Sequence, residues 1–343
     1  MFNRLMMLLA LLKSYGFKYT TSLLLAKIAG LHSIVYISDN FGNKYYINVD
    51  RKNISHILSL LSYLHDLNSR YILQNGTLLI LISNYRKSLS IDKLTINDLN
   101  NLYALTLAHK FKIELKVLDD KYLLSTSKYD SIQFIVRENA LLPDITGGPL
   151  LFYDEPQAYK WFDSILKPDD VFVDVGAYIG GYSVRACKRK AKVYSVEPDK
   201  DNYLLLLKNL EVNHCTKYWV YRCAAYSEDG VIPLRSYGSP DTCSIIAMKN
   251  GNTIKDYVIS RKLDNIIATD VEDIKLLKID VEGAELSVLK GAKEVLKKSQ
   301  YVMVEVWPHT RNRVLDLLKK SGFKLIDSEK CVPPTTNMLF IHK

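Results

Sequence analysis

The chain has 343 residues, of which 48% are hydrophobic and 24% charged, and its formal net charge at pH 7 is +9. These values are ordinary for a globular protein, and the length favours two domains. The five cysteines, an odd number without C-x-x-C spacing, exclude a zinc framework and a disulfide scaffold. We therefore expect a reducing cytosol, with Cys187 and Cys223 packed as small apolar residues.

The first 30 residues predict two basic amphipathic helices. No acidic residue precedes Asp39, and four basic residues are spread among the apolar runs 5–12 and 23–29. Neither run approaches the roughly 20 residues that cross a bilayer, and no A-x-A cleavage site marks a signal peptide. We expect these helices to pack on the protein; a peripheral contact with an anionic membrane surface is the alternative. The sequence has no tight cluster of Lys and Arg interleaved with aromatic residues, so it gives no sign of nucleic-acid binding.

The rest of the first part predicts a small α+β domain. Residues 33–38 and 44–49 flank a turn-rich segment and predict a hairpin. Further strands are predicted at 76–82, 113–118 and 132–137, and helices at 54–67 and 96–110. Pro and Gly punctuate residues 142–149, which marks a domain boundary. The prediction is an accessory α+β domain at 1–148, of unknown role, and a second domain at 149–343.

The second part alternates strands and helices, which predicts a mostly parallel sheet with right-handed crossovers. The predicted strands are 171–175, 192–197, 218–224, 274–280, 301–305, 323–326 and 338–342, with a helix at 311–320 before the last two. Because no helix separates the last two strands, we expect them to form an antiparallel hairpin. A polar, turn-rich insertion between Glu228 and Leu263 is a candidate wall of a substrate pocket.

A nucleotide-cofactor site is indicated by the sequence that follows the first of these strands. Gly176 and Gly180 stand at the strand-to-helix turn, and Glu197 ends the next strand, where a carboxylate can accept hydrogen bonds from ribose hydroxyls. The spacing Asp174-x-Gly-x-x-x-Gly differs from the dinucleotide pattern G-x-G-x-x-G, because Tyr178 occupies the position of its second glycine. The pattern favours S-adenosylmethionine over NAD; a structural turn without ligand is the third interpretation.

Carboxylates crowd the end of a later strand. Residues 274–285 begin as a buried strand and then place Asp280, Glu282 and Glu285 around Gly283. Like charges repel in a cleft of low dielectric, so such crowding indicates a function beyond folding. The alternative is a helix start, since acidic residues favour helix N-termini. Both can hold together.

These pieces resemble, in order, the FkbM-type methyltransferases. The resemblance covers residues 150–343 and rests on Asp-Val-Gly-Ala-Tyr-Ile-Gly at 174–180, Val-Glu-Pro-Asp at 196–199, Asn209 with Asn213, Lys-Leu-Asp at 262–264, Lys-Ile-Asp-Val-Glu-Gly-Ala-Glu at 278–285 and Val-Glu-Val at 304–306. It implies a Rossmann-like class I S-adenosylmethionine methyltransferase sheet, mostly parallel with an antiparallel terminal strand. It also implies O-methylation of a sugar, glycan or hydroxylated metabolite. Tyr178 departs from the family pattern, which commonly has a smaller polar residue there.

The resemblance also implies roles for individual residues. Asp174, Gly176, Ala177, Tyr178 and Gly180 would line the methionine and ribose part of the cofactor, Glu197 would bind the ribose hydroxyls, Ala225 the adenine edge, and Asp280 would lie near the sulfonium. As general base the candidates are Asp280, Glu282 and His309, since an imidazole titrates near neutrality. No metal ligand set is predicted, although carboxylates that hold a divalent ion are a lesser alternative.

Two other functions fit the sequence less well. A nucleic-acid methyltransferase usually has an Asn- or Asp-Pro-Pro-Tyr/Phe loop, whereas the Pro-Pro pair here lies at 333–334 without the amide or the aromatic residue. The second is a non-catalytic scaffold in a membrane-associated or glycosylation complex, which would need neither Gly176 nor Glu197. The prediction is a cytoplasmic, peripherally membrane-bound or soluble methyltransferase; its acceptor and its oligomeric state do not follow from the sequence.

Overall fold

The structure is a computed structural model, and it describes residues 33–38, 44–49, 71–74, 77–82, 85–90, 96–236, 243–245, 253–267, 269–330 and 335–343. The chain divides into two compact units, Met1–Ser131 with Arg137–Leu142 and Ile132–Val136 with Pro143–Lys343. The predicted leading helices and the helix at 54–67 lie outside the described residues. The predicted boundary between 148 and 149 stays a prediction.

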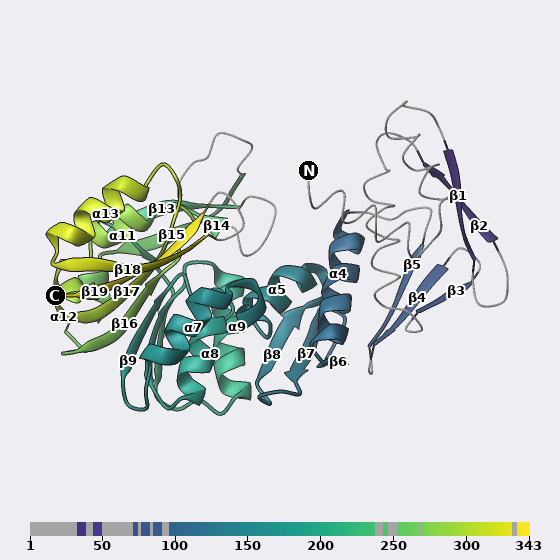
Figure 1. Cartoon of the computed structure of the whole chain (residues 1–343), viewed down its shortest axis with the longest axis horizontal. Coiled ribbons are helices and arrows are strands. Elements are labelled where there is room, and N and C mark those ends of the chain that lie inside the picture. Colours follow the sequence, from purple (N-terminus) through teal and green to yellow (C-terminus); the bar gives the residue numbers. More distant parts are fainter. Residues whose placement is uncertain are drawn as a thin grey trace. The chain divides into compact units, whose positions relative to one another are not determined.

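The first unit is α+β in its described part (Figure 1). The predicted hairpin forms, with β1 (Ser33–Ser38) antiparallel to β2 (Lys44–Val49). The other elements are β3 (Tyr71–Gln74), β4 (Thr77–Ile82), β5 (Tyr85–Ser90), α4 (Ile96–Lys110), β6 (Ile113–Val117) and β7 (Tyr122–Ser127). Strands β3, β4 and β5 form one antiparallel sheet, and β6 pairs antiparallel with β7. The sequence did not predict β3, β5 or β7.

The second unit is built on a seven-stranded sheet in the order β11-β10-β9-β16-β17-β19-β18. Its strands are β9 (Val171–Val175), β10 (Lys192–Val196), β11 (Tyr218–Tyr221), β16 (Ile274–Ile279), β17 (Ser299–Val306), β18 (Phe323–Lys330) and β19 (Thr336–His342). Five neighbouring strands of this sheet, β11, β10, β9, β16 and β17, are parallel to one another. Strand β19 lies between β17 and β18 and is antiparallel to both. This confirms the predicted sheet with its antiparallel terminal strand.

Helices cover both faces of this sheet, which is why its central strands are apolar at successive positions. They are α7 (Pro156–Ile165), α8 (Gly181–Lys188), α9 (Lys200–Val212), α10 (Leu263–Ile267), α11 (Glu285–Lys290), α12 (Lys293–Lys298) and α13 (Arg311–Lys320). Phe172 packs in one core with side chains of α7 and α8. Its neighbour Val173 packs in the opposite core, with side chains of α10 to α13. None of the described helices is long and apolar enough to cross a membrane.

The predicted insertion forms a second, smaller sheet. The predicted strand 218–224 ends at Tyr221, and the chain then enters β12 (Ala224–Ala225). The insertion adds β13 (Gly230–Ser236), β14 (Cys243–Ser244) and β15 (Thr253–Arg261), in the order β12-β15-β13-β14. Because β12 follows β11 directly, this sheet begins at the carboxyl end of the main one.

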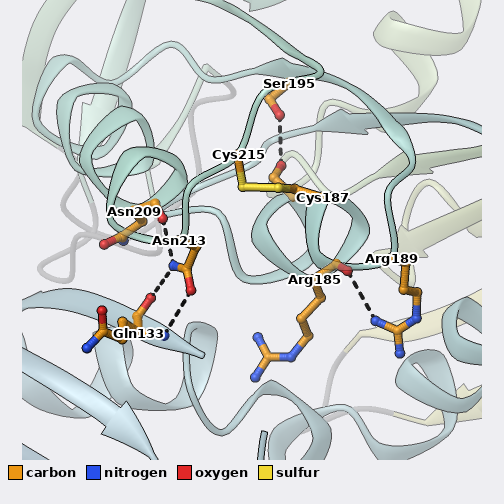
Figure 2. The surroundings of a disulfide bond; sticks show 9 residues. Gln133, Arg185, Cys187, Arg189, Ser195, Asn209, Asn213 and Cys215 are labelled. Atoms are coloured by element: carbon orange, nitrogen blue, oxygen red, sulfur yellow. Dashed lines mark hydrogen bonds between the residues drawn. A yellow bond between two sulfur atoms is a disulfide. The ribbon is translucent and has the colours of Figure 1, made fainter. Parts of the chain in front are cut away.

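Asn209 of α9 and Asn213, the C-cap of α9, bind the backbone of β8 (Gln133–Arg137), and Figure 2 shows the contact of Asn213 with Gln133. The side chain of Asn213 accepts a hydrogen bond from the Gln133 amide at 3.0 Å and donates to the Gln133 carbonyl at 2.6 Å. One turn earlier, Asn209 accepts from the Ile135 amide at 2.6 Å and donates to the Ile179 carbonyl at 2.9 Å. These buried amides replace a neighbouring strand as hydrogen-bond partners.

The cysteine prediction was wrong for Cys187, which forms a disulfide with Cys215 (Figure 2). Cys187 lies near the end of α8 and Cys215 just beyond α9, and their Cα atoms are 5.8 Å apart, a distance that a disulfide requires. The packing of α8 beside α9 brings the two cysteines together. They are 28 residues apart in the sequence, so no local pattern predicted the bond. Because disulfides persist mainly in oxidising environments, the cysteines no longer support a reducing cytosol. Cys223 is buried and free, as predicted.

Candidate active site

A pocket opens at the carboxyl ends of β9, β10, β16 and β17. Open α/β sheets bind ligands at this edge, because the loops there lead into helix N-termini and diverge around the switch point of the sheet. Of the residues predicted to bind a cofactor, the pocket is lined by Asp174, Gly176, Ala177, Tyr178, Glu197, Ala225 and Asp280. Gly180 is not among the lining residues; it is the N-cap of α8.

Gly176 allows the ends of β9 and β16 to touch. Its φ is +79°, and a Cβ at this position would lie 1.7 Å from the carbonyl oxygen of Asp280. The amides of Gly176 and Ala177 both bind the carbonyl of Val196, at 2.9 and 3.2 Å. The turn is therefore fixed by backbone contacts to both neighbouring strands, and only glycine fits there.

Glu197 ends β10 and directs its carboxylate into the same turn. It accepts hydrogen bonds from the amides of Tyr178 and Asp199, both at 2.9 Å. The residue is 5% exposed and lines the pocket. Burial raises its pKa to about 8, against the opposing effect of these two amides. Such a carboxylate, held by its own backbone, can also accept hydrogen bonds from a ligand hydroxyl.

Tyr178 contributes its backbone to the turn and its side chain to the pocket rim. It has a φ of +52°, and its amide is the donor to Glu197. Its hydroxyl donates to Asp144, and its ring lies against Gly147. The large side chain that departs from the family pattern therefore holds α5 (Leu141–Gly147) beside the pocket.

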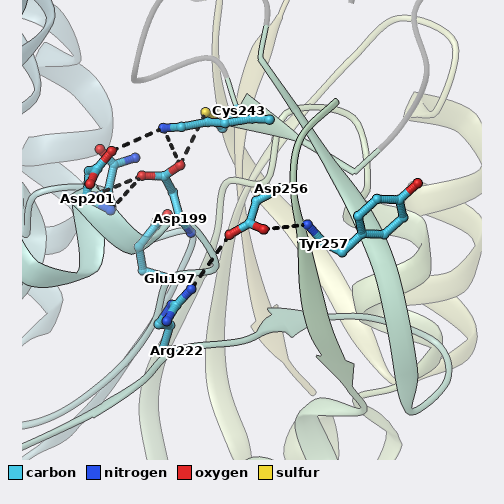
Figure 3. Close-up of polar contacts among 9 residues, drawn as sticks. Glu197, Asp199, Asp201, Arg222, Cys243, Asp256 and Tyr257 are labelled. Carbon is cyan, nitrogen blue, oxygen red and sulfur yellow. Dashed lines mark hydrogen bonds and ion pairs between the residues drawn. The ribbon is translucent and has the colours of Figure 1, made fainter. Parts of the chain in front are cut away.

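The smaller sheet closes the pocket beyond Glu197. Asp199 caps α9 by accepting from the amides of Asp201 and Asn202, and it forms an ion pair with Lys255 of β15 at 2.5 Å. The Sγ of Cys243 lies 3.9 Å from the same carboxylate (Figure 3). This ties β14 and β15 to the end of β10. The part of the pocket wall that the smaller sheet and its flanking residues form is apolar and consists of Ala224, Ala225, Leu234 and Ile245.

A buried lysine lies at the opposite end of the pocket. Lys278 of β16 is 5% exposed, and its ammonium is 3.0 Å from Asp280 and 4.9 Å from the centre of the Tyr182 ring. Burial alone would lower its pKa, but the charges of Asp280, Asp174 and Glu155 outweigh burial and raise it. The ammonium therefore stays charged among carboxylates.

Three further carboxylates line the pocket that were not among the predicted site residues, and they belong to Asp154, Glu155 and Glu305. Glu155, before α7, accepts from the Tyr182 hydroxyl at 2.8 Å, and Glu305 of β17 accepts from the Thr335 hydroxyl at 2.8 Å. Carboxylate oxygens of Asp280, Glu282 and Glu305 lie within 4.8 Å of one another. Glu155 follows no motif. Glu305 belongs to the Val-Glu-Val segment at 304–306 of the resemblance, but the sequence analysis gave it no role in the site.

The predicted catalytic residues separate in the structure. Asp280 and Glu282 line the pocket, whereas His309 is exposed and is not among the lining residues. Glu285 also lies outside the lining; it accepts from the Gly283 amide at 2.6 Å, which is the helix-start interpretation. The structure thus brings together two of the three proposed base candidates.

The pocket fits S-adenosylmethionine by the chemistry of its walls. Glu197 offers acceptors for ribose hydroxyls, the apolar wall of the smaller sheet suits an adenine ring, and carboxylates favour a cationic sulfur. In addition, Oδ1 of Asp174 is buried without a hydrogen-bond partner among the described residues, so the site holds an acceptor for a ligand donor. Its Oδ2 accepts from Ser183 at 2.6 Å.

A parallel sheet in this strand order, with its ligand pocket at the carboxyl edge, defines a class I S-adenosylmethionine methyltransferase fold, and S-adenosylmethionine is the cofactor of this class. Residues 174–325 match the family model described as the methyltransferase FkbM domain. The similarity to this family lies within the second unit and includes Gly176, Glu197 and Asp280.

Curated relatives are similar over the same part. Methyltransferase sdnD of Sordaria araneosa is 28% identical over 217 residues, which cover 52% of this chain and 83% of that protein. Hexuronic acid methyltransferase AglP of Haloferax volcanii is 32% identical over 156 residues, which cover 41% of this chain and 57% of that protein. The chain therefore spans little more than half the length of the second relative.

Similar solved structures share little sequence. TYW2 of M. jannaschii in complex with AdoMet is 16% identical, with a TM-score of 0.36 over 67% of this chain and 94% of that chain. An rRNA methylase from Streptococcus thermophilus is 10% identical, with a TM-score of 0.38 over 54% of this chain and 94% of that chain. The fold assignment rests on the strand order described above.

Proposed function

We propose that the protein transfers the methyl group of S-adenosylmethionine to a hydroxyl group of a sugar, glycan or hydroxylated metabolite. The observation that carries this proposal is the pocket itself, with the Gly176 turn and the Glu197 carboxylate at adjoining strand ends. The name of the Haloferax volcanii relative, a hexuronic acid methyltransferase, supports a sugar as acceptor. The family match supports methyl transfer as the reaction.

The chemistry needs alignment and a proton acceptor. The acceptor oxygen forms a bond to the methyl carbon as the bond from carbon to sulfur breaks, and the hydroxyl proton passes to a base. Glu197 would hold the ribose hydroxyls, and Asp280 would lie near the sulfonium. Asp280, Glu282 and Glu155 are the pocket carboxylates that can take the proton. His309 stays a candidate that depends on a movement of its exposed loop.

The first unit is proposed as an accessory domain, and a peripheral membrane contact through the first 30 residues stays a hypothesis that lies outside the described residues. The scaffold alternative predicts that the pocket binds no S-adenosylmethionine. It also predicts that substitutions in the pocket change stability alone.

We expect Asp280→Asn to slow methyl transfer by about 100-fold, because it removes a carboxylate beside the reacting groups. Purified protein is incubated with tritium-labelled S-adenosylmethionine and a panel of neutral sugars, aminosugars, uronic acids and hydroxylated metabolites, and labelled methyl ethers are identified by mass. Asp273→Asn is the matched control, since Asp273 is exposed and precedes the first residue of β16, at the end of the strand away from the pocket. Equal rates for the two variants would contradict a catalytic role of Asp280.

A further inference from the structure

The turn that follows β16 is held in a strained backbone conformation. It carries two of the pocket carboxylates, those of Asp280 and Glu282. Glu282 has a φ of +53° and Gly283 a φ of +100°, so two successive residues have positive φ. A residue with a Cβ adopts such a φ at a cost, and it does so where the surrounding structure holds it there. The contacts that hold this turn therefore decide where its carboxylates lie.

A single peptide group of the turn is bound at both ends. The carbonyl of Glu282 accepts a hydrogen bond from the hydroxyl of Ser244 at 2.7 Å. The amide of Gly283 donates to the carboxylate of Glu285 at 2.6 Å. This carbonyl and this amide belong to the same peptide bond, the one that joins Glu282 to Gly283. Ser244 is 2% exposed and Glu285 is fully buried, and hydrogen bonds away from water are electrostatically stronger.

The two partners of this peptide group come from separate elements of the second unit. Glu285 is the first residue of α11, whereas Ser244 lies in β14 of the smaller sheet. Its neighbour Cys243 lies 3.9 Å from the carboxylate of Asp199, which follows β10 (Figure 3). Strand β14 therefore contacts both the segment after β10 and the turn after β16.

The start of the turn does not depend on this peptide group. The amide of Asp280 donates to the carbonyl of Val175 at 2.9 Å, and the carbonyl of Asp280 lies against Gly176. Strand β9 thus fixes the backbone of Asp280, whereas the bound peptide group fixes the remainder of the turn. Loss of the Ser244 hydroxyl should therefore displace Glu282 and leave the donor side of the pocket intact.

We propose that Ser244 and Glu285 are positioning residues that hold one peptide group of this turn and thereby keep the Glu282 carboxylate at the pocket. This inference rests on the proposed function, in which Glu282 is a candidate base. The smaller sheet then does more than form a wall, because its β14 completes the turn that bears this carboxylate. Since small misplacements of reacting groups are costly, we expect Ser244→Ala to slow methyl transfer about tenfold or more. Its affinity for S-adenosylmethionine should stay within about twofold of the unchanged protein.

The peptide group can be observed directly, because Glu282 and Gly283 form the single Glu-Gly pair in the sequence. Protein labelled with ¹³C at the glutamate carbonyl and ¹⁵N at glycine gives one NMR signal for it. We expect Ser244→Ala to shift this signal and to speed exchange of the Gly283 amide about tenfold or more, because the released peptide group can turn. An unchanged signal with unchanged exchange would overturn the proposal, whichever acceptor the protein uses.

Ser260→Ala is the matched control. Ser260 is 1% exposed in β15 of the same small sheet, and its hydroxyl donates to the carbonyl of Glu228 at 3.0 Å rather than to the turn. It loses a buried hydroxyl of the same kind, so both serine variants should share any general effect on stability. We expect Ser260→Ala to keep the exchange of Gly283 and the transfer rate with the panel of acceptors given above. Equal transfer rates in the two serine variants would refute the positioning role of Ser244.

Glu285 provides a second test. Glu285→Gln keeps an oxygen that can accept from the Gly283 amide, and its new amide can donate to the Thr310 hydroxyl, now 3.4 Å away. Glu285→Leu removes the acceptor. We expect Glu285→Leu to reproduce the effects of Ser244→Ala, and Glu285→Gln to transfer methyl groups about threefold faster than Glu285→Leu or more.

Circular dichroism verifies the folding of each variant, and the two serine variants carry the test if Glu285→Leu does not fold. Equal rates in folded Glu285→Gln and Glu285→Leu would count against the role of Glu285. If the unchanged protein binds no S-adenosylmethionine, the proposed function fails, whereas the NMR signal of the Glu282–Gly283 peptide group still decides whether Ser244 holds the turn.

Discussion

The substitution Gly176→Ala is expected to abolish S-adenosylmethionine binding and to lower the free energy of unfolding by about 3 kcal/mol or more. The added Cβ would lie 1.7 Å from the Asp280 carbonyl oxygen, which is a backbone atom and cannot turn away. The positive φ of +79° adds strain for any residue with a Cβ. Because β9 and β16 meet at this point, relief of the clash must separate the two strands that bear the site.

Gly230→Ala is the matched control for this experiment. A Cβ at Gly230 would have its nearest contact at 3.7 Å, to the Ser260 hydroxyl, in ordinary van der Waals contact. Urea unfolding followed by fluorescence gives the stability of both variants, and calorimetry gives their affinity for S-adenosylmethionine. If Gly176→Ala binds as the unchanged protein does, the turn does not have the role assigned to it here.

We expect Lys278→Met to destabilise the protein by about 3–5 kcal/mol, because it leaves buried carboxylates without their cation. The ammonium is 3.0 Å from Asp280, and the charges of Asp174 and Glu155 also act on it. Methionine has a similar length, so the loss of charge dominates over the loss of volume. Lys275→Met on the same strand is the control, since Lys275 donates to Gln300 in an exposed contact of 2.7 Å.

A double-mutant cycle separates the ion pair from other effects of the substitution. Asp280→Asn removes one of the carboxylates that pair with Lys278. The double variant Lys278→Met with Asp280→Asn should therefore lose less stability than the sum of the losses in the two single variants. Urea unfolding at neutral pH measures all four proteins. Strictly additive losses would show that Lys278 and Asp280 do not depend on one another.

The sheet was predictable because its strands are buried on both faces. Phe172 and Val173 belong to opposite cores, and such strands appear in the sequence as continuous apolar runs between helices. The smaller antiparallel strands gave weaker patterns, and β3, β5 and β7 were missed. The predicted strand 218–224 spans two strands of different sheets, because the apolar pattern does not record the change of direction after Tyr221.

The candidate site was predictable where a motif sits at a strand end. Gly176 directly follows a predicted strand, and Glu197 and Asp280 are the last residues of predicted strands. Parallel strands bring their carboxyl ends to one edge of the sheet. Glu155 was missed because it comes from a segment between two short helices, and its place beside Lys278 is a tertiary contact. The Cys187–Cys215 bond was missed for the same reason, since it depends on how α8 packs beside α9.

Calorimetric titration of the protein with S-adenosylmethionine, repeated with Glu197→Ala, tests the central claim most directly. The account predicts binding to the unchanged protein and at least tenfold weaker binding to Glu197→Ala, about 1.4 kcal/mol, because the ribose hydroxyls lose their acceptor. Glu272→Ala, which changes an exposed glutamate before β16, should bind normally. An absence of binding to the unchanged protein, or equal binding to Glu197→Ala, would contradict the cofactor site described here.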